Sequence, residues 1–107
     1  MIEVSTPDYV SGRSAGTSTV TLTGELDMAC SPEIREMLLD EISRPGVQRV
    51  IVDLAEVTFI DSSFISALVA GYHTAKAFGS EFVVVNPMPR ISKVLRVAGI
   101  LDLLCAG

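Results

Sequence analysis

The residues best suited to chemistry are an aspartate and two serines in a row, Asp61, Ser62 and Ser63. They follow the apolar run of residues 57–60 and precede a stretch with the apolar spacing of a helix. A short polar residue at such a place accepts hydrogen bonds from the free backbone N–H groups of the first helical turn. The local pattern therefore predicts a capped helix start that carries two hydroxyl groups.

A serine that acts as a nucleophile needs a base, and His73 is the only histidine in the chain. It lies in a helical stretch beside Tyr72, and no serine sits in a Gly-x-Ser-x-Gly turn. The sequence also lacks a phosphate-binding glycine loop and a set of cysteines or histidines at zinc-binding spacing. We therefore expect no enzyme activity, no metal and no cofactor. A hydrolase that uses Ser62 with His73 is the least supported hypothesis.

Composition narrows the range of partners. The 107 residues include 8 Lys and Arg against 13 Asp and Glu, a formal net charge of -5, and 49% hydrophobic residues. This balance fits one packed domain over residues 1–107 and argues against direct nucleic-acid binding. Because no apolar run is long enough for a membrane span and the first residues show no export signal, we expect no membrane insertion and a cytoplasmic location. Without export, Cys30 and Cys105 should stay free thiols.

The first half of the chain has the pattern of two strands, a helix and a third strand. Residues 1–10 are expected to form an opening strand, residues 11–16 a flexible connection, and residues 18–23 a second, antiparallel strand. Ser31, which precedes a proline, is expected to cap the helix. The apolar run at residues 49–54 predicts an interior strand, parallel to the strand before it because a helix connects the two.

The second half has the pattern of alternating helices and strands. A helix is expected to follow residues 61–63 and to run to about residue 78, and its predicted buried face consists of Ile65, Leu68, Val69 and Tyr72. A buried strand at residues 81–85 precedes a helix at residues 91–98, and the apolar tail at residues 100–104 should pack back on the domain. The prediction is an α/β fold with a mixed sheet flanked by helices, in the order β-β-α-β-α-β-α plus a C-terminal turn or short helix.

Three short stretches occur in a characteristic order. They are Gly-Glu-Leu-Asp at 24–27 before a helix, Asp-Leu at 53–54 after an apolar strand, and Phe-Ile-Asp-Ser-Ser at 59–63. Together they resemble the STAS-domain family, and most of all the bacterial anti-sigma factor antagonists within it. The resemblance runs from Thr19 to Leu104, which is nearly the whole chain.

The resemblance implies a function and assigns roles to residues. In that family the first serine after the aspartate is phosphorylated by a partner anti-sigma factor that acts as a serine kinase, and here that serine is Ser62. Asp61 would help to shape the site, Ser63 would be the less favoured acceptor, and Asp27 would contribute to partner contact. The unphosphorylated protein would bind the anti-sigma factor and free a sigma factor. Phosphorylation would stop that binding, and a serine phosphatase would restore it.

One position departs from the family pattern. A glycine follows the two hydroxyl residues in the family, whereas this chain has Phe64. Two interpretations stay open: an inward-facing core residue that leaves Ser62 accessible, or a functional change, which would be either a different partner surface that includes Phe64 or the loss of phosphorylation at Ser62. The second interpretation leaves room for another hypothesis, a STAS subunit that binds a transport ATPase or a signalling scaffold without a sigma factor. The sequence leaves open the oligomeric state and the identity of the sigma factor, the kinase and the signal.

Overall fold

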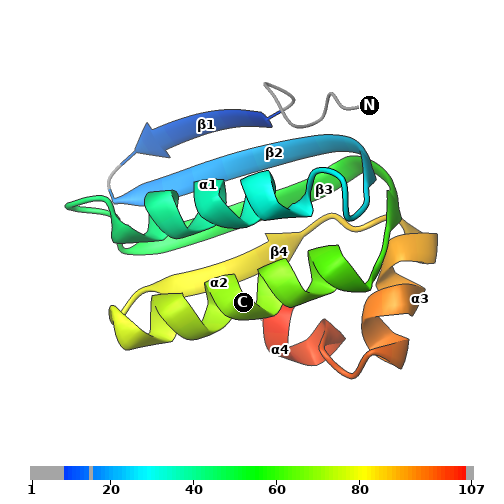
Figure 1. The fold of residues 1–107 in the computed structure, drawn as a ribbon. Helices are drawn as coiled ribbons and strands as arrows, with labels where there is room; N and C mark the ends of the chain where they lie inside the picture. Colours follow the sequence, from blue (N-terminus) through cyan, green and yellow to red (C-terminus); the bar gives the residue numbers. More distant parts are fainter. Residues whose placement is uncertain (1–8, 15, 106–107) are drawn as a thin grey trace.

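The computed structural model describes residues 9–14 and 16–105, and the side chains of residues 16–105. This part of the chain forms four strands and four helices (Figure 1). Their bounds are β1 (Tyr9–Ser14), β2 (Thr17–Leu26), α1 (Ser31–Ser43), β3 (Arg49–Ile60), α2 (Ser62–Ala77), β4 (Glu81–Val85), α3 (Pro89–Val97) and α4 (Leu101–Cys105). The order confirms the predicted α/β fold, including the short helix at the C-terminal end.

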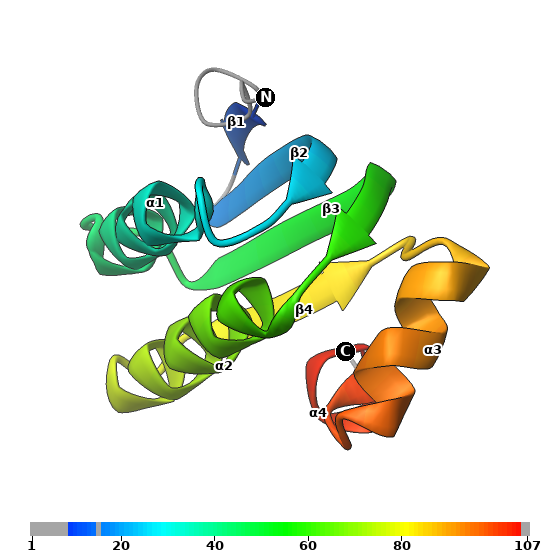
Figure 2. The ribbon, with the colours of Figure 1, turned by 45° about the vertical axis from the view of Figure 1, so that its right-hand side comes forward.

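The strands form one mixed sheet in the order β1-β2-β3-β4. β1 pairs antiparallel with β2, whereas β2 with β3 and β3 with β4 are parallel, as the lengths of the connections predict. α1 and α2 lie side by side on one face of the sheet, and α3 and α4 lie beyond β4, at the edge opposite β1 (Figures 1 and 2). Leu26 pairs with Ile60, so the carboxyl ends of β2 and β3 meet where α1 and α2 begin.

Alternate residues of the inner strands point into the core. In β3 the side chains of Val50, Val52 and Leu54 are fully buried, and the residues between them are only partly buried. Full burial of one such aliphatic side chain contributes about 1.5–3 kcal/mol. One buried cluster joins β2, β3 and β4 to all four helices, and its largest fully buried members are Phe64, Leu26, Leu38, Ile42, Leu54, Leu68, Ile91, Leu95 and Leu104.

The face that α2 turns toward the sheet differs from the predicted one. Its buried residues are Phe64, Ala67, Leu68, Gly71 and Ala75. Of the four residues predicted for this face only Leu68 is fully buried, and the other three are partly exposed. The helix is rotated so that small residues face the sheet, which allows a close approach. A Cβ atom on Gly71 would lie 2.9 Å from the ring of Phe82.

Three boundaries of the predicted strands are wrong. Residues 11–14, predicted as a flexible connection, belong to β1, and the turn to β2 is tight, with Gly16 at φ 85°. β2 continues to Leu26, and β3 takes in residues 57–60, because the parallel pairing resumes after a register shift. Residues 1–8 of the predicted opening strand lie outside the described residues.

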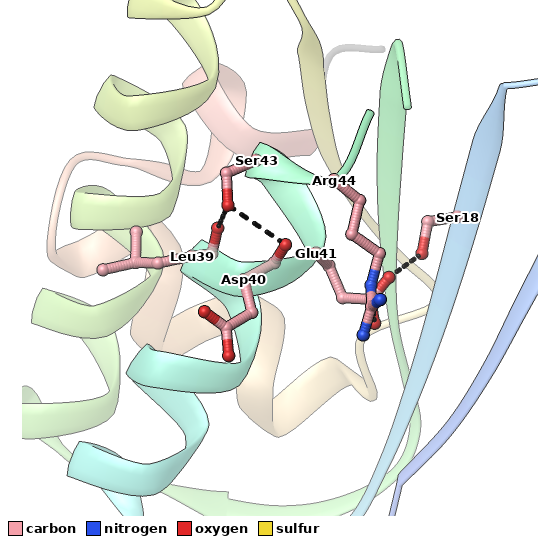
Figure 3. A network of polar contacts seen from close by, with 6 residues as sticks. All are labelled: Ser18, Leu39, Asp40, Glu41, Ser43 and Arg44. Carbon is pink, nitrogen blue, oxygen red and sulfur yellow. Dashed lines mark hydrogen bonds and ion pairs between the residues drawn. The ribbon is translucent and has the colours of Figure 1, made fainter. Parts of the chain in front are cut away.

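A buried polar group lies near the far end of α1, beside the amino end of β2 (Figure 3). Glu41 is 3% exposed, and one of its carboxylate oxygens accepts a hydrogen bond of 2.7 Å from the buried hydroxyl of Ser18. The other oxygen lies 3.3 Å from Nε of Arg44, whose side chain is half exposed. We call these three residues the Glu41 cluster.

Other predicted features of the fold can be compared directly. The tail forms α4, and its Leu104 is fully buried, which confirms that this segment packs on the domain. Cys30 is buried and Cys105 half-buried, and both are free thiols whose pKa is raised by burial. None of the helices in residues 9–14 and 16–105 is both long and apolar enough to cross a membrane.

Candidate functional site

The start of α2 is capped by Asp61, as the sequence predicts. Asp61 has extended backbone geometry, and its Oδ1 accepts hydrogen bonds from the backbone N–H groups of Ser63 at 3.0 Å and Phe64 at 3.2 Å. The hydroxyl of Ser63 lies 2.6 Å from the same oxygen. One carboxylate oxygen therefore collects three donors from the first helical turn, which ties up the N–H groups that usually attract an anion there.

These hydrogen bonds decide the ionisation of Asp61. Partial burial favours the neutral form, but the hydroxyl of Ser63 and the backbone N–H groups of Phe64, Ser63 and Met28 outweigh it and lower the pKa of Asp61. The carboxylate is therefore charged at neutral pH. Met28 belongs to the connection between β2 and α1, so the charge also attracts a backbone group of a second segment.

The two serines after Asp61 differ in what holds them. Ser62 is exposed, and none of the hydrogen bonds in the described part of the chain involves its hydroxyl. Ser63 is half-buried, and its hydroxyl contacts both Asp61 and Ser31. Ser62 is therefore the hydroxyl that an approaching molecule can reach, whereas Ser63 belongs to the structure of the helix start.

The start of α1 departs from the prediction. Ser31 was expected as the N-cap, but the N-cap is Cys30, no side chain caps it, and Ser31 is the first helical residue. The carbonyl oxygen of Asp27 takes over this role: it accepts from the backbone N–H groups of Cys30 at 3.1 Å and Ser31 at 3.0 Å, and from the Ser31 hydroxyl at 2.8 Å. The Asp27 carboxylate accepts from the N–H of Ala29 at 3.0 Å, so Asp27 holds the whole turn.

A hydroxyl pair joins the two helix starts. Ser63 Oγ lies 3.1 Å from Ser31 Oγ, although the two residues are 32 positions apart. Ser31 gives its one hydroxyl proton to the Asp27 carbonyl oxygen and can only accept in this contact, and Ser63 has one proton for two acceptors, Ser31 Oγ and the nearer Asp61 Oδ1. We call Asp27, Ser31, Asp61 and Ser63 the Asp61 cluster. The structure thus brings together three of the predicted site residues, and it adds Ser31, which sequence reasoning assigned only to capping.

Phe64 resolves the two interpretations left open by the sequence. Its side chain is 0% exposed and lies within the core. It therefore offers no direct contact to a partner, which corrects its inclusion among the partner-binding residues. Its inward direction leaves the neighbouring Ser62 exposed.

The arrangement is unsuited to autonomous serine chemistry. His73 is exposed on α2, with its ring 5.5 Å from that of Tyr72. It lies eleven residues after Ser62, or about 16 Å along the helix, so the two cannot form a nucleophile–base pair. Within the described residues, no three His, Cys, Asp or Glu side chains are grouped in a way that could hold a metal ion.

Comparisons with known proteins agree with this fold. The STAS domain family matches residues 10–105, and the chain therefore belongs to the STAS domain family. An anti-sigma F factor antagonist of Paenibacillus polymyxa is 26% identical over 89 residues, which cover 83% of this chain and 76% of that protein.

Solved structures show the same fold in two kinds of protein. The anti-sigma factor antagonist SpoIIAA in its unphosphorylated form superposes with a TM-score of 0.79 at 23% identity, over 91% of this chain and 84% of that chain. The phosphorylated form of SpoIIAA from Bacillus gives 0.72 at 23% identity, over 91% and 87%. The murine anion transporter Slc26a9 gives 0.74 at 23% identity, over 89% of this chain and 16% of that chain. At these identities the likeness shows the fold alone.

Proposed function

We propose that the chain is an anti-sigma factor antagonist switched by phosphorylation of Ser62. In the unphosphorylated state it binds an anti-sigma factor that is also a serine kinase, and a sigma factor is freed. A serine phosphatase returns the phosphorylated protein to the binding state. The observation that carries the proposal is the contrast between the exposed, unbonded hydroxyl of Ser62 and the hydrogen-bonded hydroxyl of Ser63 beside it.

The chemistry needs a partner enzyme. No base lies within reach of Ser62 in the geometry described above, so the kinase supplies both the base and the ATP. A bond forms between Ser62 Oγ and the γ-phosphorus while the bond to the ADP oxygen breaks, and the hydroxyl proton passes to the kinase base. The chain itself acts as the substrate and the ligand rather than as a catalyst.

The switch is expected to act on the interface and not on the fold. Phosphorylation adds a charge of about -1.5 to -2 to Ser62. Asp61 already accepts the N–H groups of Ser63 and Phe64, so the new phosphate finds these donors taken and stays at the surface. Desolvating such a group against an unmatched partner costs several kcal/mol, which is enough for a hundredfold loss of affinity.

Three residues around Ser62 have proposed roles in the same surface. Asp27, half-buried at the start of α1, would receive a basic group of the partner, and Asp61 would hold the helix start and add negative charge. Ser63 would fix the geometry of the first turn through Asp61 and Ser31. Each role concerns positioning or contact, and only Ser62 would be modified.

The named relatives support this proposal over the alternative of a transporter-associated subunit. The Paenibacillus polymyxa relative is called an anti-sigma F factor antagonist, and the match covers 76% of that protein. The likeness to the anion transporter concerns the fold alone. We accordingly propose a single STAS domain that acts in the cytoplasm through a protein partner.

A pull-down from the native cytosol tests the proposal. Wild type and Ser62→Ala should both retain a serine-kinase anti-sigma factor, and Ser62→Asp should lose it, because only the third variant carries the added charge. Equal recovery on the three baits would contradict the switch, and absence of any anti-sigma factor on wild type would contradict the assigned partner.

A further inference from the structure

A groove of ≈ 370 Å³ runs between the N-terminal halves of α1 and α2. It is adjacent to the Asp61 cluster, with which it shares Ser31 and Ser63, and its other lining residues are Met28, Pro32, Arg35, Ser66 and Ala67. We propose that this α1–α2 groove accepts an aromatic side chain of the anti-sigma factor that is flanked by a carboxylate. The inference rests on the proposed function and names the partner chemistry that it requires.

The floor of the groove suits an apolar occupant. The hydroxyl protons of Ser31 and Ser63 are already directed to acceptors within the Asp61 cluster. Ala67 contributes only a buried methyl group. A flat apolar side chain can therefore lie on this floor without leaving either of these two hydroxyl protons unpaired.

The wall formed by Met28 favours an aromatic ring. Met28 is 71% exposed, so its thioether is not part of the core. A methionine sulfur makes favourable contacts with aromatic rings, and its flexible chain can close over a ring that enters beside it. The ring of Pro32 provides a second flat apolar surface in the same groove. The exposed side chain of Met28, next to the small residues of the groove, is therefore suited to pack against a side chain of a partner.

The charge on the α1 side of the groove favours a carboxylate. Arg35 is exposed, and among the described residues it makes no ion pair and no hydrogen bond. A guanidinium binds a carboxylate through two parallel hydrogen bonds, which fixes orientation as well as charge. Asp27 and Asp61 lie on the Ser62 side, so the partner should present a basic group there and an acidic group over Arg35.

The same molecule would contact the groove and Ser62. The backbone N–H of Met28 interacts with Asp61, and Ser63 belongs both to the groove and to the turn that presents Ser62. A protein that binds at the Ser62 hydroxyl therefore lies next to the groove. This continuity favours the anti-sigma factor over a second copy of the chain as the occupant.

Affinity measurements with variants test the groove. Isothermal titration with the purified serine-kinase anti-sigma factor of the same genome should show at least tenfold weaker binding for Arg35→Glu and about tenfold weaker binding for Met28→Ala. Lys76→Glu and Phe78→Ala are matched controls, because they change an exposed cation and an exposed aromatic at the far end of α2. Both controls should bind within twofold of wild type. Replacing the partner's acidic residue by lysine should restore binding to Arg35→Glu.

The outcomes separate this inference from the proposed function. If Arg35→Glu and Met28→Ala bind the anti-sigma factor like wild type while Ser62→Asp does not bind it, the proposed contact at the groove is wrong and the proposed switch at Ser62 is supported. If wild type binds no anti-sigma factor, the proposed function fails, and the inferred occupant fails with it. If the two groove variants instead abolish a self-association of the chain seen in sedimentation, a second copy is the occupant and the inference is wrong.

Discussion

The Asp61 cluster and the Glu41 cluster use the same chemistry at opposite ends of α1. In each, a carboxylate accepts a hydrogen bond from a serine hydroxyl: Glu41 from Ser18 of β2, and Asp61 from Ser63, which lies two residues further along the chain. Glu41 is 3% exposed, and its serine partner Ser18 is fully buried. Asp61 is only partly buried, and the residue beside it, Ser62, presents a hydroxyl to the solvent.

This difference in burial separates a structural role from a functional one. The Glu41 cluster ties α1 to β2 and leaves no reactive group accessible except the half-exposed arginine at its rim. The Asp61 cluster fixes two helix starts and leaves one hydroxyl outside its hydrogen bonds. We therefore expect changes in the Glu41 cluster to alter stability, and changes around Ser62 to alter binding. The following predictions test that division.

The largest effect on stability is expected at Phe64, which anchors the first turn of α2 in the core. Phe64→Ala should lower the free energy of unfolding by about 3–5 kcal/mol, because a fully buried ring leaves a cavity. Urea denaturation measures the loss. Phe78→Ala, which removes a ring that is 59% exposed, should cost less than about 0.5 kcal/mol. Equal losses in the two variants would show that Phe64 is not a core residue.

The largest effect on binding is expected at Ser62. Ser62→Asp should weaken the complex with the anti-sigma factor at least about a hundredfold, or about 2.7 kcal/mol, with an unchanged melting temperature. Ser43→Asp adds the same charge to an exposed serine near the Glu41 cluster and should leave the affinity unchanged. Isothermal titration of both variants gives the comparison. Similar weakening by both would mean that net charge, and not the Ser62 site, controls binding.

Removal of the Glu41 carboxylate should change stability without changing binding. Glu41→Ala deprives the buried Ser18 hydroxyl of its acceptor and should cost about 2 kcal/mol. The combined Ser18→Ala and Glu41→Leu variant should recover most of this loss, since it removes both partners. Denaturant unfolding and titration with the anti-sigma factor test the two halves of the prediction. A loss of affinity in the folded Glu41→Ala variant would break the division between the clusters.

The smallest effect is expected from the cap at Asp61, and it should depend on pH. Asp61→Ala should cost about 1 kcal/mol at pH 7, whereas Asp61→Asn, which still accepts the backbone N–H bonds, should cost less. The folded-state pKa of Asp61 is lowered below its unfolded value of about 3.9, so its ionised form stabilises the fold above that pH. This contribution is lost as the pH falls through the folded-state pKa. Unfolding free energies of the wild type and Asp61→Ala should therefore converge below about pH 4, and a difference that stays constant would be inconsistent with an ionised cap.

The sequence allowed much of the fold to be predicted because local signals were strong. The apolar run before Asp61, the capping aspartate and the periodic residues after it placed the start of α2 correctly. The helix between the strands predicted at residues 18–23 and 49–54 correctly indicated their parallel pairing. The strand ends were missed because they depend on pairing with a neighbour: residues 57–60 are held in β3 by the carboxyl end of β2.

The hydrogen bonds within the site were less predictable from the sequence. Ser31 looked like a helix cap, yet its hydroxyl bonds the Asp27 carbonyl and contacts a serine 32 positions away. No local pattern reveals such a contact, and the same holds for Ser18 and Glu41, which are 23 positions apart. The inward direction of Phe64 likewise follows from the face that α2 buries, which also includes Ala67, Leu68, Gly71 and Ala75.

Mapping the site of phosphorylation tests the central claim most directly. The purified chain, incubated with its serine-kinase anti-sigma factor and ATP, should gain one phosphate on Ser62, located by fragmentation mass spectrometry, and the backbone amide spectrum should change only near the start of α2. Ser62→Ala should gain none, although Ser63 is still present. A phosphate on Ser63, or an unmodified wild-type chain, would contradict the account.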